Sequence, residues 1–329
     1  MSNHRKCMML LFIFCLTVTL GAQAVLAEGK YPSRNISLVI PWAPGGGTDI
    51  TGRIFAEELA KVLNVAITPD NKPGATGTSG AVMVIGAKKD GYTLMVNTIS
   101  AMILAQFSLP DVPFDALKDF TPITNIAISP SIIFVKGDSP IRSIEDLINE
   151  AKKKPGKLTF STAGVGSENH LNTEHFMILS KIKCAHVPYK SGGEALTAVL
   201  GGHQDFGTSL VAPLASQLKA GTVRGLIHSN NKRIAFLPDV PTYAEKGFSE
   251  HFFSNWTGLF APAAIPHPIL DTLSRASEKA INSEGFISRM EKLGSLAAFQ
   301  TPGEFRSMLE KELITARALV KQIGLTPQK

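Results

Sequence analysis

The chain of 329 residues has few cysteines and few aromatic side chains, whereas its charged content of 18% is ordinary for a globular protein. Of its three cysteines only Cys184 lies beyond the first 27 residues, so no intrachain disulfide can form in the rest of the chain. The position of Cys184 at the entry to an apolar strand predicts a buried, inert thiol. Aromatic residues make up 7%, and no basic stripe is interleaved with them, which argues against nucleic acid as a partner. No apolar run reaches the roughly 20 residues of a membrane-spanning helix.

The first 27 residues have the pattern of a secretory signal. His4, Arg5 and Lys6 form a basic start, residues 8–20 are apolar, and two small-residue cleavage patterns follow at 22–24 and 25–27. The pattern leaves open which of the two cleavage sites is used. We therefore predict export across the inner membrane and a periplasmic mature protein.

Short apolar stretches alternate with amphipathic ones along the rest of the chain. Residues 36–40 predict a strand and residues 50–63 a helix, and the same unit recurs in both halves. Two C-terminal helices are expected at 268–293 and 302–323. Alternation of this kind predicts an α/β fold in which mostly parallel sheets are flanked by helices on both faces.

Two extended, weakly charged stretches, 120–135 and 252–262, predict crossings between two lobes. We expect a discontinuous first lobe of residues 28–124 and 256–329, and a second lobe of residues 125–255. A cleft would then lie between the lobes, where the carboxyl ends of parallel strands place ligands.

Small and hydroxyl-bearing residues form the loops that follow several predicted strands. Gly45, Gly46 and Gly47 precede a helix that Thr48 or Asp49 is expected to cap, and similar loops lie at 162–167 and 189–193. Residues 97–100 carry amide and hydroxyl groups at the end of another strand. Because a helix N-terminus offers free N–H groups and a positive dipole end, these loops predict a binding site for a small organic anion.

Other kinds of chemistry have weaker support in the sequence. The dinucleotide fingerprint and the P-loop are absent, and the histidines lack the spacing of metal ligands, so neither cofactor nor metal is expected. Ser167 and His170 leave open an exported serine hydrolase, although no third, orienting group is evident and G-x-S-x-G does not occur. Asp49 and Asp205 either cap local structure or bind a ligand ammonium or hydroxyl group.

Several segments, in order along the chain, carry a resemblance to one family. They are residues 41–49 (PWAPGGGTD), 71–75 (NKPGA), 90–94 (DGYTL), 163–167 (AGVGS) followed by His170 and Leu171, 186–190 (HVPYK), 237–242 (LPDVPT) and 258–262 (GLFAP). Together these motifs resemble the Bug family of periplasmic solute-binding proteins, which serve tripartite tricarboxylate transporters. The resemblance implies a two-lobed type II periplasmic-binding-protein fold that closes on a small carboxylate.

The resemblance also implies the ligand contacts. In the first lobe they are Trp42, Ala43, Pro44, Gly45, Gly46, Thr48, Asp49, Asn97, Thr98 and Ser100, and in the second they are Ala163, Gly164, Ser167, His170, Tyr189, Lys190 and Asp205. Trp42 is larger than the Phe or Tyr common in the family, and the run 205–209 differs from the usual one. Both differences could reshape the distal end of the pocket.

The function implied is that of a non-enzymatic, monomeric binding protein that delivers a small carboxylate to the membrane permease subunits of a transporter. Besides the hydrolase, a second alternative is a binding protein that presents its ligand to a membrane sensor. The sequence does not name the carboxylate.

Overall fold

The computed structural model describes residues 31–230, 232–248 and 252–322, so the predicted signal segment lies outside the described residues. Contacts divide the chain into residues 1–34 and 35–329, and the second unit contains every helix and strand named below. Within the described ranges, no helix combines the length and the apolar character that crossing a membrane requires.

A six-stranded sheet is built from both ends of this unit, in the order β11-β4-β10-β3-β1-β2. Its strands are β1 (Ile36–Ile40), β2 (Ile67–Asn71), β3 (Thr93–Thr98), β4 (Phe120–Ser129), β10 (Asn255–Pro262) and β11 (Leu296–Ala297). Strands β1, β2 and β3 are parallel, as predicted, whereas β10 runs antiparallel to both β3 and β4.

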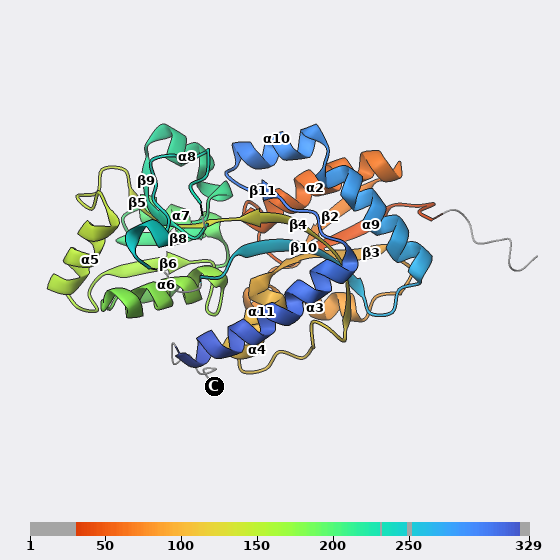
Figure 1. Ribbon diagram of the computed structural model, residues 1–329, viewed down its shortest axis with the longest axis horizontal. Coiled ribbons are helices and arrows are strands. Elements are labelled where there is room, and N and C mark those ends of the chain that lie inside the picture. Colours follow the sequence, from red (N-terminus) through yellow and green to blue (C-terminus); the bar gives the residue numbers. More distant parts are fainter. Residues whose placement is uncertain (1–30, 231, 249–251, 323–329) are drawn as a thin grey trace, which may run out of the picture. The chain divides into compact units, whose positions relative to one another are not determined.

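Helices cover both faces of this sheet (Figure 1). They are α2 (Gly47–Leu63), α3 (Thr78–Ile85), α4 (Ala105–Ser108), α9 (His267–Ile281), α10 (Glu284–Lys292) and α11 (Pro302–Gln322), with short turns η1 (Ala75–Gly77) and η2 (Ser100–Leu104). The single helix predicted at 268–293 is divided into α9 and α10. The Ser283 side chain accepts a hydrogen bond from Phe286 N and so caps a new helix at that point.

A five-stranded sheet in the order β7-β6-β8-β5-β9 forms from the middle of the chain. Its strands are β5 (Ser131–Lys136), β6 (Thr159–Thr162), β7 (Ala185–Pro188), β8 (Phe206–Leu210) and β9 (Val223–His228). Its helices are α5 (Ile144–Lys153), α6 (Glu168–Ser180), α7 (Gly192–Leu200) and α8 (Ala215–Ala220), with the turns η3 (Ala212–Leu214) and η4 (Ala244–Lys246).

The two stretches predicted as crossings are extended in the structure. β4 ends at Ser129 in the six-stranded sheet and β5 begins at Ser131 in the five-stranded sheet, with Pro130 between them. The chain returns through β10, where Asn255 pairs with Ser129. The exact lobe boundaries given above stay a prediction.

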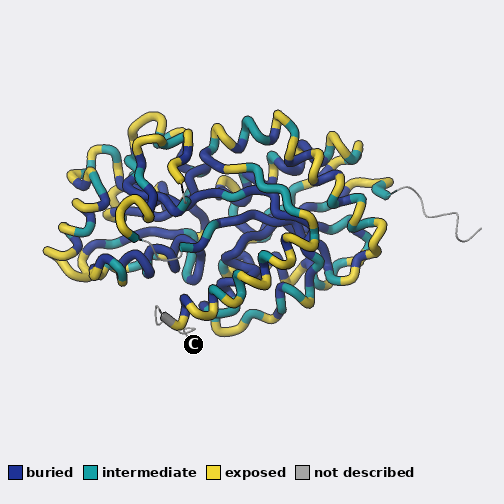
Figure 2. The backbone as a smooth tube through the Cα atoms, viewed as in Figure 1, coloured by how far each residue is buried: buried dark blue, intermediate teal, exposed yellow. Residues whose placement is uncertain are grey.

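Central strands are buried on both faces, as Figure 2 shows by their dark colour beneath more exposed helices. In β1, the consecutive residues Leu38, Val39 and Ile40 are all buried, which is expected of a strand covered on both sides. One core packs α3 and α11 onto the six-stranded sheet, and two others lie on the faces of the five-stranded sheet. These cores hold the strand ends, and hence the loops after them, in fixed positions.

Candidate functional site

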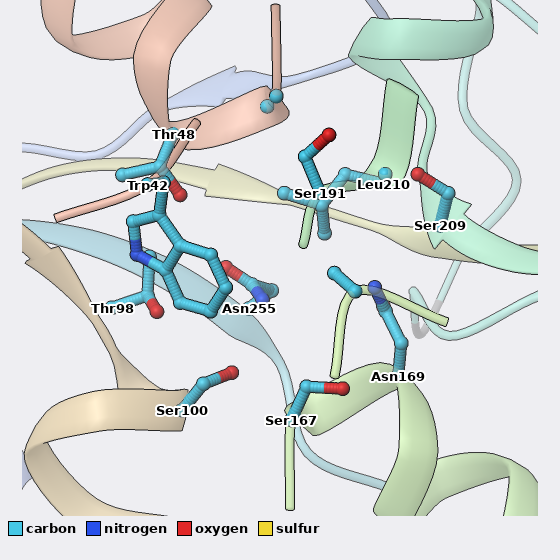
Figure 3. Close-up of a pocket in the computed structure, with 14 residues that line it drawn as sticks. Trp42, Thr48, Thr98, Ser100, Ser167, Asn169, Ser191, Ser209, Leu210 and Asn255 are labelled. Carbon is cyan, nitrogen blue, oxygen red and sulfur yellow. The ribbon is translucent and has the colours of Figure 1, made fainter. Parts of the chain in front are cut away.

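A cavity lies where loops from the two sheets meet, and Figure 3 shows side chains from both sheets facing one another across it. It has a volume of about 30 Å³, enough for about one or two water molecules, so a larger ligand fits only if the two sheets move apart. Its lining residues are Trp42, Gly46, Gly47, Thr48, Thr98, Ser100, Ala163, Ser167, Asn169, Ser191, Gly192, Ser209, Leu210 and Asn255. None of these residues carries a charged side chain.

The first helix at the cavity is α2, which begins at Gly47 after an extended Gly46. The prediction that Thr48 or Asp49 caps this helix is wrong, because Gly46 is the capping residue and makes no side-chain capping bond. The helix thus starts three residues earlier than a cap at Asp49 would require. Its first N–H groups, beside the cavity-lining Gly47 and Thr48, are left for a ligand.

Asp49 fixes this loop rather than lining the cavity. It is 3% exposed, and its carboxylate accepts hydrogen bonds from Gly45 N at 2.9 Å, Arg53 Nε at 2.8 Å and Asn71 Nδ2 at 2.8 Å. Asn71 Nδ2 also donates to the Trp42 carbonyl at 2.9 Å. The loop between β1 and α2 is therefore held from behind by an ion pair and an amide.

The second helix at the cavity is α6, which Ser167 caps by accepting a hydrogen bond from His170 N. Ser167 Oγ also donates to the Gly164 carbonyl at 2.7 Å. The His170 ring bonds elsewhere, since its Nδ1 accepts from Gly166 N at 3.1 Å and its Nε2 lies 3.6 Å from Glu174 Oε1. The structure therefore does not pair the Ser167 hydroxyl with the imidazole as a nucleophile and its base, and the comparisons below give the hydrolase alternative no support.

The third helix is α7, where Ser191 is the cap and accepts from Glu194 N at 3.2 Å. A Cβ placed on Gly192 would lie 2.2 Å from Ser209 Oγ, so the helix end and β8 can approach this closely only with glycine there. Tyr189 and Lys190, just before this helix, line a neighbouring cavity that shares Trp42 and Ala163 with the first.

The predicted site residues thus fall into three groups. Trp42, Gly46, Thr48, Thr98, Ser100, Ala163 and Ser167 line the first cavity, and Gly164, Tyr189 and Lys190 line the neighbouring one. Ala43, Pro44, Gly45, Asp49, Asn97, His170 and Asp205 line neither of these two.

Like Asp49 and His170, two more of the residues outside the cavities have clear structural partners. Asp205 precedes β8, and its carboxylate accepts from Thr159 N at 2.7 Å and Thr159 Oγ1 at 3.0 Å, where β6 begins. It therefore lies at the amino end of these parallel strands, opposite the edge at which ligands bind. Asn97 is fully buried, and its amide bonds the Gly77 carbonyl and Thr98 N.

Sequence reasoning missed several lining residues. Ser191 and Gly192 lie in the predicted loop 189–193 but are not among the contacts that the resemblance implies, and Asn169 lies two residues after the loop 162–167. Gly47 belongs to the first glycine run, and Leu210 and Ser209 end β8. Asn255 carries no local signal, because it reaches the cavity only through the pairing of β10.

Buried polar atoms without a protein partner gather at this cavity. Within the described part of the chain, no hydrogen-bond partner is present for Trp42 Nε1, Thr98 Oγ1, Asn169 Oδ1, Ser209 Oγ or Asn255 Oδ1. Burial of an unsatisfied polar group costs about 1 to 3 kcal/mol, so such atoms call for water or a ligand. The cavity is therefore polar but uncharged, and three helix N-termini meet at it.

One buried acid lies directly behind the lining residues. Glu168, the first residue of α6, is inaccessible to solvent, and burial raises the pKa of its carboxyl to about 7 even though bonds from Ser131, Asn255 and Asn172 favour the ionised form. Elsewhere in the described residues, no cluster of three His, Cys, Asp or Glu side chains has the arrangement of a metal site.

The comparisons with known proteins agree with this geometry. A family model described as "Tripartite tricarboxylate transporter family receptor" matches residues 51–325. The chain belongs to that family. The fold of this receptor-family protein matches the structure of the periplasmic binding protein BugD, with a TM-score of 0.86 and 27% identity over 91% of this chain and 100% of that one. The resemblance to the Bug family and the two-lobed fold are thereby confirmed.

Two further solved structures of similar proteins were determined with carboxylates. Rpa4515 of R. palustris, solved with adipate, has a TM-score of 0.88 and 27% identity over 91% of this chain and 100% of that one. MatC of Rhodopseudomonas palustris, solved with bound malate, has a TM-score of 0.82 and 28% identity over 88% of this chain and 100% of that one.

Proposed function

We propose that this receptor-family protein is a periplasmic, non-enzymatic binding protein that captures a small organic carboxylate in the cavity between its two sheets. It would then deliver the carboxylate to the membrane permease subunits of a tripartite tricarboxylate-type transporter. The observation that carries the proposal is the meeting of three helix N-termini at one buried cavity without an acidic lining residue. The adipate and malate of the two similar structures support the class of ligand.

The proposed binding energy comes from backbone groups and dipoles. Each helix N-terminus favours a negative charge by about 0.3 to 1 kcal/mol when exposed and by up to about 2 kcal/mol when partly buried. Hydroxyl and indole donors at Thr98, Ser209 and Trp42, left without protein partners, add hydrogen bonds. We propose that the lobes close on the ligand by bending at the crossings near Pro130 and Asn255.

A thermal-shift panel of mono-, di- and hydroxycarboxylates and amino acids tests this function. A ligand at 100 times its Kd adds about 2.7 kcal/mol to the stability, and each kcal/mol raises the midpoint by roughly 2 to 4 °C for domains of this size class. We expect at least one small carboxylate to raise the midpoint. If no carboxylate raises it while ester substrates are hydrolysed, the protein is an enzyme and the proposal fails.

A glycine variant connects the shift to the cavity. A Cβ on Gly46 would lie 3.3 Å from the Ala43 carbonyl and 3.6 Å from Ser191 Cβ, so the branched side chain of Gly46→Val would enter the space beside the N-terminus of α2. We expect this variant to fold but to lose the ligand-induced shift. Gly303→Val is the matched control, because a Cβ on Gly303 in α11 meets no atom within 4 Å. An unchanged shift in Gly46→Val would remove this loop from the site.

A further inference from the structure

The Asn255 side chain presents its amide oxygen, rather than its amide nitrogen, to the cavity. Asn255 opens β10, is 4% exposed, and lines the cavity at the centre of the view in Figure 3. Its Nδ2 donates to Glu168 Oε2 at 3.4 Å, whereas its buried Oδ1 has no partner among the residues that the structure describes. The free atom at the cavity is therefore a hydrogen-bond acceptor.

Glu168 determines which end of this amide faces the cavity. Glu168 Oε1 accepts from Ser131 Oγ at 2.9 Å and from Asn172 Nδ2, so the carboxyl group is held in place by β5 and by its own helix. An ionised carboxylate can only accept hydrogen bonds. If the Asn255 amide turned over, Oδ1 would face Glu168 Oε2 and two acceptors would meet without a proton between them. The amide nitrogen is thus kept on the side of Glu168 and the oxygen on the side of the cavity.

An acceptor in this position restricts the ligand. A carboxylate has no donor of its own, so it satisfies the helix N-termini but not Asn255 Oδ1. Asn169, another lining residue, also has a buried Oδ1 without a protein partner in the described part of the chain. The donor on the ligand is then a hydroxyl or an ammonium group. The ammonium group is disfavoured, because three helices direct their positive ends at the cavity and no acidic side chain lines it.

We propose that Glu168 is a positioning residue that holds the Asn255 amide with its oxygen toward the cavity, and that the ligand is a hydroxycarboxylate whose hydroxyl donates to this oxygen. The proposal rests on the proposed function, because it takes this cavity to be the carboxylate site. Glu168 acts through Asn255 and does not itself line the cavity.

Once protonated, the Glu168 carboxyl would no longer fix the orientation of the Asn255 amide. Burial raises the pKa of the Glu168 carboxyl to about 7, so near neutral pH a proton can occupy Oε2 and donate to Asn255 Oδ1. The amide is then free to present its nitrogen to the cavity. The hydrogen-bond partners of the carboxyl are Ser131 in β5, Asn172 in α6 and Asn255 in β10, and none of them is titratable. Tyr243 is a titratable neighbour, and its pKa is raised by burial and by the Glu168 charge.

The experiment compares acids that differ by one hydroxyl, using calorimetric titration of the whole protein at pH 8. The pairs are lactate with propionate, malate with succinate, and 2-hydroxyadipate with adipate. We expect the hydroxy acid to bind about 10-fold more tightly within at least one pair, as one hydrogen bond to a buried group allows. We also expect the preference to fall as the pH is lowered from 8.5 to 6.5.

Glu168→Gln tests the positioning role. The amide oxygen of the substituted side chain can still accept from Ser131 and Asn172, and its amide nitrogen would then face the Asn255 amide, which turns over to accept from it. We expect this variant to lose the hydroxyl preference and its pH dependence while still binding the plain acid. Glu150→Gln, at a partly exposed position on α5, is the matched control and should keep both.

The outcomes are distinguishable. Equal or tighter binding of the plain acid in every pair that binds, or tighter binding of aspartate than of malate, overturns the hydroxycarboxylate assignment but leaves the proposed function standing. A hydroxyl preference that survives in Glu168→Gln overturns the positioning role. Binding of no carboxylate by the wild type overturns the proposed function itself. If Glu168→Gln does not fold, an unchanged preference between pH 6.5 and 8.5 in the wild type overturns the role of Glu168.

Discussion

The contact between Gly47 and Leu210 predicts a variant that folds normally but binds ligand weakly. Gly47 begins α2 beside the six-stranded sheet, and Leu210 ends β8 in the five-stranded sheet, so the two residues meet across the cavity. A Cβ on Gly47 would lie 2.5 Å from Leu210 Cδ1 and 3.1 Å from Leu210 Cβ, well below the roughly 3.5 to 4.0 Å of ordinary carbon contacts. Rotation of the leucine relieves the first clash but not the second.

Gly47→Ala should therefore destabilise the arrangement in which the two sheets lie close together. Overpacking of this kind costs about 1 to 3 kcal/mol. If only the closed, ligand-bound state suffers it, the Kd rises by roughly 5-fold to 150-fold, since each 1.4 kcal/mol is a factor of about ten. Alanine is the better helix former, so the unfolding midpoint of the ligand-free protein should not fall.

Calorimetric titration and thermal unfolding, each with and without ligand, measure the two quantities. Gly303→Ala, near the start of α11 with no atom within 4 Å of its Cβ, controls for the general effect of replacing a helical glycine. An unchanged Kd in Gly47→Ala would show that the two sheets do not approach this closely in the bound state. A large fall in the ligand-free midpoint would show instead that the contact belongs to the stability of the fold.

Buried titratable groups give two further predictions. The fold raises the pKa of the Glu168 carboxyl from 4.5 to about 7, so the free energy of unfolding of the wild type should fall as the pH rises through this window. Glu168→Gln lacks this titration, so its free energy of unfolding, measured with urea, should rise by up to about 3 kcal/mol relative to that of the wild type between pH 5 and pH 8. An equal pH dependence of the two proteins would contradict this prediction. Burial raises the pKa of the Cys184 thiol to about 12, so iodoacetamide at pH 8 should modify this thiol much faster in urea than in the native protein. Mass spectrometry measures the rate of modification, and rapid labelling of the native protein would refute the prediction.

The parts of the site that the sequence predicts are those made by local chain order. An apolar run, a small-residue loop and a helix start form a strand-loop-helix unit, and the carboxyl ends of parallel strands share one edge. The loops around Gly46 and Ser167 reach the cavity for this reason. The same reasoning carries Thr98 and Ser100 there, at the end of β3.

Asp205 shows where local pattern is insufficient. Residues 204–209 look like a polar loop, yet Phe206–Leu210 is a fully buried strand, β8. Gly207 is needed there because a Cβ would lie 2.5 Å from Phe134 Cζ on the neighbouring strand. A residue that precedes this strand lies at the opposite edge of the sheet from one that follows it. The position of Asp205 therefore depends on a strand that the polar composition of residues 204–209 does not predict.

Asn255 could not be predicted for a different reason. Its position depends on the register of β10, in which Asn255 pairs with Ser129 and Thr257 pairs with Thr98, both far away in the sequence. Contacts between antiparallel strands brought together from distant parts of the chain leave no periodic signal near the residue itself. The presence of the Asn255 acceptor in the cavity lining is therefore determined by the strand topology.

The uncharged lining suits a receptor that must release its ligand as well as bind it. A buried Lys or Arg in contact with the carboxylate would give strong, charge-assisted hydrogen bonds, and such a cation would remain unpaired and costly once the ligand left. Helix N-termini such as that of α2 carry only partial charges and are solvated without that cost wherever water reaches them. Among the residues that line the two cavities, the one cation is Lys190, and it lines only the neighbouring cavity. Affinity should consequently depend on how closely the two sheets approach, which makes a single methyl group at Gly47 more damaging than removal of the Lys190 charge.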